Sequence, residues 1–181
     1  MTSTAPHGNS ADSARALCIL GAFCLFLSAV EYMIPKPLPF LRIGLANLPL
    51  MLSLYIFPLR AYLILICIKV LGQALITGTL FSYIFLFSLT GTFLSALLMF
   101  LLARVFGRRR ITFIGIGTAG AFVSNISQLA LAYFFIFKDN VRYIAPPFLL
   151  TGLVTGIALG VFCEVFAGKS KWFNKITNRE F

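Results

Sequence analysis

The sequence predicts an all-α polytopic membrane protein, a bundle of six transmembrane helices. Of its 181 residues, 60% are hydrophobic and only 11% are charged, and the mean hydropathy is +0.96. A soluble domain of this length needs far less apolar surface. The apolar residues also fall into six stretches, and the basic residues are distributed very unevenly between them. Together, these three observations are typical of a protein that crosses a membrane several times.

The six apolar stretches are the candidate spans. In order, they cover approximately residues 16–33, 45–57, 61–80, 82–103, 111–137 and 146–167. A bilayer core about 30 Å thick needs roughly 20 mainly apolar residues in each helix. The second stretch is shorter than this, so its helix must tilt little or include part of the segment before it.

The polar ends of the chain frame a single domain. Residues 1–14 are polar and rich in Ser and Thr, which predicts a disordered N-terminus. Residues 15–168 form the predicted transmembrane domain, and residues 169–181 form a basic tail. We expect no separate soluble domain.

The basic residues predict the orientation of the spans. With six spans, both termini share one side, which holds ten of the fifteen Lys and Arg residues, while four lie on the other side and one lies inside a span. The first side holds Arg15, Arg60, Arg104, Arg108, Arg109, Arg110, Lys169, Lys171, Lys175 and Arg179, and the second holds Lys36, Arg42, Lys138 and Arg142. Because cytoplasmic loops carry the excess of basic residues, we expect both termini in the cytoplasm. Anionic lipids are the expected contacts of these charges, and nucleic acid is not an expected partner.

The sequence carries no recognisable enzyme or metal site. It has no D-D-x-x-D, G-x-S-x-G, H-E-x-x-H or P-loop motif, and its five acidic residues offer few metal ligands. His7 is the only histidine, and Cys18, Cys24, Cys67 and Cys163 form no C-x-x-C pair. We expect no catalysis, no cofactor and no metal. Any ATP-driven step must then use the energy of another protein.

Seven polar side chains are predicted to converge on the outer half of the bundle. Polar groups are costly within a span, so they usually face the bundle interior or a water-filled cavity. They are Glu31, Arg42, Asn47, Lys69, Gln73, Asn125 and Gln128. Lys69 and Gln73 are four residues apart, and Asn125 and Gln128 are three apart, so each pair shares a helix face. We interpret the group as a substrate-binding pocket, with hydrogen bonds between helices as the alternative for any single member.

The segment between the first two spans has the composition of a lid. It reads PKPLPFLRIG over residues 35–44, and its prolines favour a stiff, extended strip over a helix. Its apolar residues would cap the pocket from outside, and Arg42 would point a guanidinium at an anionic group of the solute. The positive charge of Lys69 likewise indicates an anionic group on the solute. An ordinary interfacial connector is the alternative.

Two stripes of small residues have the four-residue spacing that lets membrane helices approach closely. The stripe in the first span is Ala14, Cys18 and Ala22, and the stripe in the sixth is Gly152, Gly156 and Gly160. We expect the glycine stripe to pack inside the bundle. The stripe of the first span is more open to contact with a partner protein, but the sequence does not separate the two roles.

Three strings of residues resemble a known family. They are PLPFLRIGLAN at 37–47, GTLFS at 78–82 followed by FLFSLTG at 85–91, and N-x-x-Q at 125–128. Over residues 15–168 the chain resembles the Gx transporter family, often labelled heptaprenyl diphosphate synthase component I. That family is similar to the substrate-binding S-components of energy-coupling-factor (ECF) transporters.

This resemblance implies a six-helix bundle of the bacterial inner membrane, with an outward-facing pocket and a lid between its first two helices. It also implies that small residues of the first helix contact a transmembrane coupling subunit, which works with two ATP-binding subunits. Three positions depart from the family pattern. Cys18 stands where alanine is usual, Lys69 where arginine is frequent, and Ser124 where histidine is frequent.

Two functions follow as hypotheses. The leading one is the substrate-binding subunit of an ATP-driven uptake transporter for a small, vitamin- or cofactor-precursor-like solute. The alternative is a membrane component of polyprenyl (heptaprenyl) diphosphate synthesis, which binds an isoprenoid or docks a soluble synthase through the basic residues of 104–110. A solitary secondary carrier is less favoured, because the spans show no inverted repeat.

Overall fold

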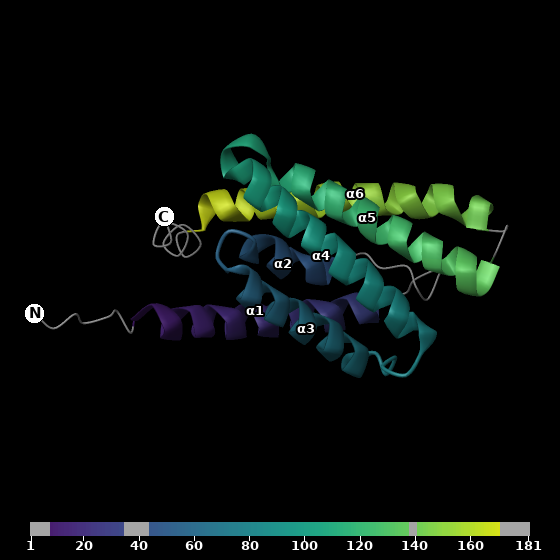
Figure 1. Cartoon of the computed structure of the whole chain (residues 1–181), viewed down its shortest axis with the longest axis horizontal. Coiled ribbons are helices and arrows are strands. Elements are labelled where there is room, and N and C mark those ends of the chain that lie inside the picture. Colours follow the sequence, from purple (N-terminus) through teal and green to yellow (C-terminus); the bar gives the residue numbers. More distant parts are fainter. Residues whose placement is uncertain (1–7, 35–43, 138–140, 171–181) are drawn as a thin grey trace, which may run out of the picture.

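The computed structural model describes residues 8–34, 44–137 and 141–170, and within these ranges it is helical with no strand. The elements are α1 (Gly8–Met33), the 3-10 turn η1 (Leu45–Asn47), α2 (Leu48–Ser53), α3 (Leu59–Ile76), α4 (Tyr83–Arg110), α5 (Phe113–Ala132), the π-helical turn η2 (Tyr133–Phe137) and α6 (Val141–Lys169). The long helices lie side by side along one axis (Figure 1). The predicted all-α membrane bundle is confirmed.

Five helices are long and apolar enough to cross a membrane. Their candidate spans are Ser13–Met33, Leu59–Ile76, Tyr83–Gly107, Phe113–Phe135 and Tyr143–Lys169. They correspond to the first, third, fourth, fifth and sixth predicted stretches. The first helix begins at Gly8 and so includes part of the N-terminal segment that we expected to be disordered.

The second predicted span, residues 45–57, differs from the expectation. It forms only η1 and the six residues of α2, which extend about 9 Å at 1.5 Å per residue and do not cross a membrane. Gly44 precedes η1 in a left-handed conformation (φ 82°). Pro58 follows α2 and disfavours helix at the residue before it. The helix between these two residues is therefore shorter than the apolar stretch.

Helix α2 is enclosed by the rest of the bundle, and each of its six residues is buried. A polypeptide without a full spanning helix is tolerated at membrane depth when protein surrounds it. Although α2 is short, the chain still returns across the bundle between α1 and α3, because both helices start at the same end (Figure 1). Within the described residues, five helices instead of the expected six are therefore candidate membrane spans.

The exposed basic residues collect at one end of the bundle. The start of α1, the start of α3, the end of α4 and the end of α6 all lie at the left in Figure 1. These helix ends carry Arg15, Arg60, Arg104, Arg110 and Lys169, whose side chains are exposed. The grouping agrees with the predicted topology, and the assignment of this end to the cytoplasm stays a prediction.

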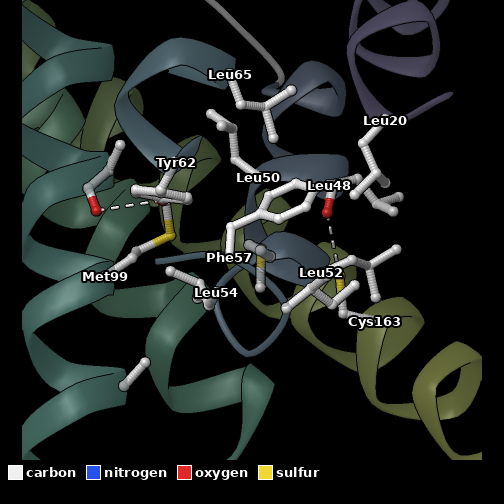
Figure 2. Close-up of a cluster of buried hydrophobic side chains, with 14 of the residues drawn as sticks. Leu20, Leu48, Leu50, Leu52, Leu54, Phe57, Tyr62, Leu65, Met99 and Cys163 are labelled. Atoms are coloured by element: carbon white, nitrogen blue, oxygen red, sulfur yellow. Dashed lines mark hydrogen bonds between the residues drawn. The ribbon is translucent and has the colours of Figure 1, made fainter. Parts of the chain in front are cut away.

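The apolar core surrounds α2. Leu50, Leu54 and Phe57 lie together there (Figure 2) and are at most 2% exposed. Two buried thiols hold the backbone around the start of α2, since Sγ of Cys24 lies 3.7 Å from the carbonyl oxygen of Ala46 and Sγ of Cys163 lies 3.9 Å from that of Leu48. Lipid tails are as apolar as leucine, so van der Waals packing and such polar contacts hold this core together.

Candidate functional site

A polar cavity lies inside the bundle, and all six α-helices together with η1 contribute to its wall. Its volume is about 40 Å³, enough for a few water molecules. The lining residues are Glu31, Gly44, Ala46, Asn47, Met51, Lys69, Gln73, Thr92, Ser95, Met99, Gly117, Ala121, Ser124, Asn125, Gln128, Gly152, Thr155, Gly156 and Leu159. Six of the seven residues predicted to form a pocket therefore line one cavity. The seventh, Arg42, lies outside the described residues, as does most of the predicted lid.

Glu31 reaches the cavity from the last turns of α1. It is 1% exposed, and its Oε1 accepts a hydrogen bond of 3.1 Å from the backbone N–H of Gly44. The left-handed conformation of Gly44 is one that glycine adopts at no steric cost. Glu31 thus fixes the point where the chain enters η1.

Lys69 and Gln73 lie on one face of α3, as their four-residue spacing predicted, and both are buried. The ammonium of Lys69 donates hydrogen bonds to Oδ1 of Asn47 and to Oγ1 of Thr92, the latter at 3.4 Å. A charged amine is costly in a membrane interior unless polar groups surround it. Lys69 therefore links η1 to α4 across the cavity.

Asn125 and Gln128 share one face of α5 and are also buried. Nδ2 of Asn125 donates to the carbonyl oxygen of Phe148 on α6 at 2.8 Å, and Nε2 of Gln128 donates to Oγ of Ser124 at 3.0 Å. Gly152 makes room for the Asn125 amide, because a Cβ at Gly152 would lie 2.7 Å from Cγ of Asn125. Of the two side chains, Asn125 is the one that ties helices together.

Three buried polar atoms at the cavity have no hydrogen-bond partner in the described part of the chain. They are Oε1 of Gln73, Oγ of Ser95 and Oε1 of Gln128, which come from α3, α4 and α5. Leaving a buried polar atom unpaired costs about 1–3 kcal/mol. All three belong to residues that line the cavity.

Sequence reasoning missed two cavity residues on α4, Thr92 and Ser95. Both are buried, as is Ser88, and the three have the spacing i, i+4 and i+7, which lies along one helix face. Small hydroxyl residues are common in membrane helices, so none of them stands out alone. Their shared periodicity is the signal that would have placed them on the inner face.

The glycine stripe of α6 packs inside the bundle, as predicted. A Cβ at Gly156 would lie 3.0 Å from the carbonyl oxygen of Gly117, and a Cβ at Gly160 would lie 2.5 Å from Cα of Ile114. Only glycine permits this approach of α5 and α6. The contact brings Asn125 within reach of the α6 backbone and so builds one wall of the cavity.

The small residues of α1 do not reach the cavity. Ala14, Cys18 and Ala22 are all exposed, and their spacing puts them on one face of the helix. They leave a shallow surface beside larger exposed side chains such as Phe26 and Ile19. Their predicted role as a partner contact stays a prediction.

Glu164 has a different role from the one its sequence position predicts. Its place near the basic end of α6 predicts an ion pair with Lys169 or Arg104. In the structure, its Oε2 accepts a hydrogen bond of 2.8 Å from the backbone N–H of Phe113. A carboxylate is favourable at the N-terminus of α5, where N–H groups lack helical partners.

Metal ligands do not cluster in the described ranges, where no three His, Cys, Asp or Glu residues lie close enough to hold an ion. The chemistry that the lining residues offer is hydrogen bonding, together with one carboxylate and one ammonium.

Comparison with known proteins adds a family. Residues 20–166 match the family described as heptaprenyl diphosphate synthase component I. No curated protein and no solved structure matches the chain. The match covers most of the 181 residues, including every residue that lines the cavity. The chain therefore belongs to the heptaprenyl diphosphate synthase component I family, the one that its sequence strings resemble.

Proposed function

We propose that this protein is the solute-binding membrane subunit of an ATP-driven uptake system. The observation that carries the proposal is the convergence of Glu31, Asn47, Lys69, Gln73 and Gln128 on one cavity, although they come from four different helical segments. Helix packing alone does not need this arrangement, because polar contacts between membrane helices contribute only about 0.6 kcal/mol on average.

The unpaired atoms of the cavity support binding over packing. In the part of the chain that the structure describes, each of Gln73, Ser95 and Gln128 buries a polar atom without a hydrogen-bond partner, and each such atom destabilises the protein by about 1–3 kcal/mol. A side chain kept only for stability would be better replaced by an apolar one. Binding sites are where stability is commonly sacrificed to function.

Energy for uptake would come from other subunits, since the sequence carries no nucleotide-binding motif. The exposed stripe of Ala14, Cys18 and Ala22 is the surface that we assign to a transmembrane coupling subunit. Small side chains let a partner helix approach closely within a membrane. Two ATP-binding subunits would act through that partner, as the resemblance to ECF transporters implies.

A second candidate follows from the family description. In it, the protein assists a heptaprenyl diphosphate synthase at the membrane. The exposed Arg60, Arg104, Arg110 and Lys169 at one end of the bundle would attract a diphosphate product or an acidic synthase surface. The polar lining of the cavity is poorly matched to an apolar prenyl tail, which favours the first candidate.

Affinity purification in mild detergent, followed by mass spectrometry of the co-eluting proteins, separates the two candidates. The uptake proposal predicts a membrane coupling protein and two ATP-binding subunits. It also predicts that Ala22→Leu loses them, while Ala158→Leu, an equal change at an exposed position of α6, keeps them. A prenyl diphosphate synthase recovered without any ATPase would favour the second candidate and contradict the first.

A further inference from the structure

We infer that four exposed tyrosines bind the boundary between the headgroups and the acyl chains of a phospholipid bilayer, and that they fix the depth of the bundle there. They are Tyr32, Tyr83, Tyr133 and Tyr143. The surface lies at the end of the bundle opposite the exposed basic residues. The inference goes beyond the proposed function, because it concerns lipid contacts that either candidate function requires.

The exposed tyrosines are confined to one end of the bundle. Of the six tyrosines in the chain, Tyr62 is buried and Tyr55 is half-buried. The other four are 47–83% exposed, and they lie at the end of α1, at the start of α4, in η2 directly after α5 and near the start of α6. These helix ends lie opposite the basic ends, toward the right in Figure 1.

Exposed phenylalanines do not share this distribution. Phe106 lies near the basic end of α4, Phe122 lies in the middle of α5, and Phe162 lies in the second half of α6. A tyrosine differs by its hydroxyl, which both donates and accepts hydrogen bonds and has no partner among acyl chains. Tyrosine is therefore enriched where the ring contacts acyl chains and the hydroxyl reaches headgroups or water. The segregation of the two residue types indicates a bilayer boundary at this end.

The lengths of the helices place the second boundary at the basic residues. In α1, Arg15 and Tyr32 are 17 residues apart, or about 26 Å at 1.5 Å per residue. The separation is about 32 Å from Tyr83 to Arg104 in α4, and about 39 Å from Tyr143 to the end of α6. A hydrocarbon core is about 30 Å thick, and about 40–45 Å with its headgroup regions. The tyrosines and the basic residues thus fit the two faces of one bilayer.

The two boundaries give the depth of the cavity. On α3, Lys69 is nine residues from Arg60, and on α4, Thr92 is nine residues from Tyr83. Each is therefore about 14 Å from its own boundary, close to half the thickness of the core. The hydrogen bond of 3.4 Å between Lys69 and Thr92 then lies near the bilayer centre. From there the cavity extends to Glu31, which lies at the level of the tyrosines.

Single tryptophan probes test the contact with the boundary. The chain has one tryptophan, Trp172, outside the described residues, so Trp172→Phe in the full chain gives a background for such probes. In it, tryptophan replaces each of the four tyrosines in turn, or Phe93, an exposed residue ten positions along α4 from Tyr83. Each variant is reconstituted in phosphatidylcholine vesicles whose acyl chains are brominated near the headgroup or near the chain end. The ratio of quenching by the two lipids measures the depth of the probe.

The four tyrosine positions should lie about 15 Å from the bilayer centre, and position 93 should lie within about 5 Å of it. Probes at the tyrosine positions that are as deep as the probe at position 93 would overturn the inference. Probes that are quenched by aqueous iodide and by neither lipid would also overturn it, because the tyrosines would then stand in water.

A second measurement tests whether the tyrosines hold the bundle at this depth. Replacing all four by leucine lengthens the apolar surface, so the bundle should sink into the bilayer by up to about 5 Å, one helical turn. Leu75→Trp measures this shift from α3, which carries none of the four. The matched control replaces four other exposed aromatic residues by leucine and should not shift the probe; they are Phe23, Phe93, Phe122 and Phe162. The same depth of the probe in both variants would overturn the anchoring role.

Discussion

Gly152→Ala is the substitution whose effect the geometry predicts most sharply. A Cβ at this position would lie 2.7 Å from Cγ of Asn125, so the amide must turn away and lose its 2.8 Å hydrogen bond to the Phe148 carbonyl oxygen. Overpacking costs about 1–3 kcal/mol, and a buried amide left unpaired costs about 1–3 kcal/mol. The better helix propensity of alanine returns about 1 kcal/mol.

The net loss for Gly152→Ala is therefore about 3 kcal/mol, or a fall in Tm of about 6–12 °C for a chain of this length. Thermal unfolding of the purified protein in mild detergent measures it. Gly168→Ala is the control, because a Cβ there meets nothing within 4 Å. In the background Asn125→Ala, Gly152→Ala should cost at least about 1 kcal/mol less, since the clash is gone. Equal Tm values for Gly152→Ala and Gly168→Ala would refute the reasoning.

Three further predictions follow from other contacts. Gly160→Ala should lower the free energy of unfolding by about 3 kcal/mol, because its Cβ would lie 2.5 Å from the Ile114 backbone, which cannot rotate away. The yield of monodisperse protein on gel filtration checks this. A yield like that of the wild type would count against the close α5–α6 contact. Glu164→Gln should lower the free energy of unfolding by about 0.5–1 kcal/mol at low salt and by less at high salt. Tm values at two ionic strengths measure this, and a loss of stability that does not depend on salt would exclude an effect of charge at the helix terminus. Lys69→Met should speed amide hydrogen exchange in α2, because Asn47 loses its hydrogen bond to the Lys69 ammonium. Hydrogen exchange with mass spectrometry measures the rate, and an unchanged rate would show that this hydrogen bond does not hold η1 in place.

Much of the cavity was predictable because it depends on helix periodicity. In any α-helix, the spacing puts Lys69 and Gln73 on one face, and Asn125 and Gln128 on another. Because exposing these polar side chains to lipid costs free energy, each face turns toward the inside of the bundle. By contrast, the hydrogen bond from the Phe113 N–H to Glu164 joins two residues that are 51 positions apart in the sequence. No local rule gives such a contact, so the sequence pointed to nearby cations instead.

The length of the second helix could not be predicted from hydropathy. A helix enclosed by protein and a helix enclosed by lipid are both uniformly apolar, so the composition of 45–57 fits either. Gly44 and Pro58 are local signals of interruption in the sequence, and the structure shows Gly44 in a left-handed conformation. Their consequence, a short buried helix beside the cavity, depends on how α1, α3 and α6 pack around it, which periodicity does not specify.

The central claim is that the polar cavity of this bundle binds a solute. Mass spectrometry of small molecules that co-purify with the full chain from its native membranes tests it most directly, with wild type compared with the double variant Gln73→Leu/Gln128→Leu and with Ala158→Leu as control. The account predicts one small polar compound bound to the wild type and to the control, and strongly depleted in the double variant. The same small-molecule content in all three proteins, or a prenyl compound retained by all of them, would contradict it.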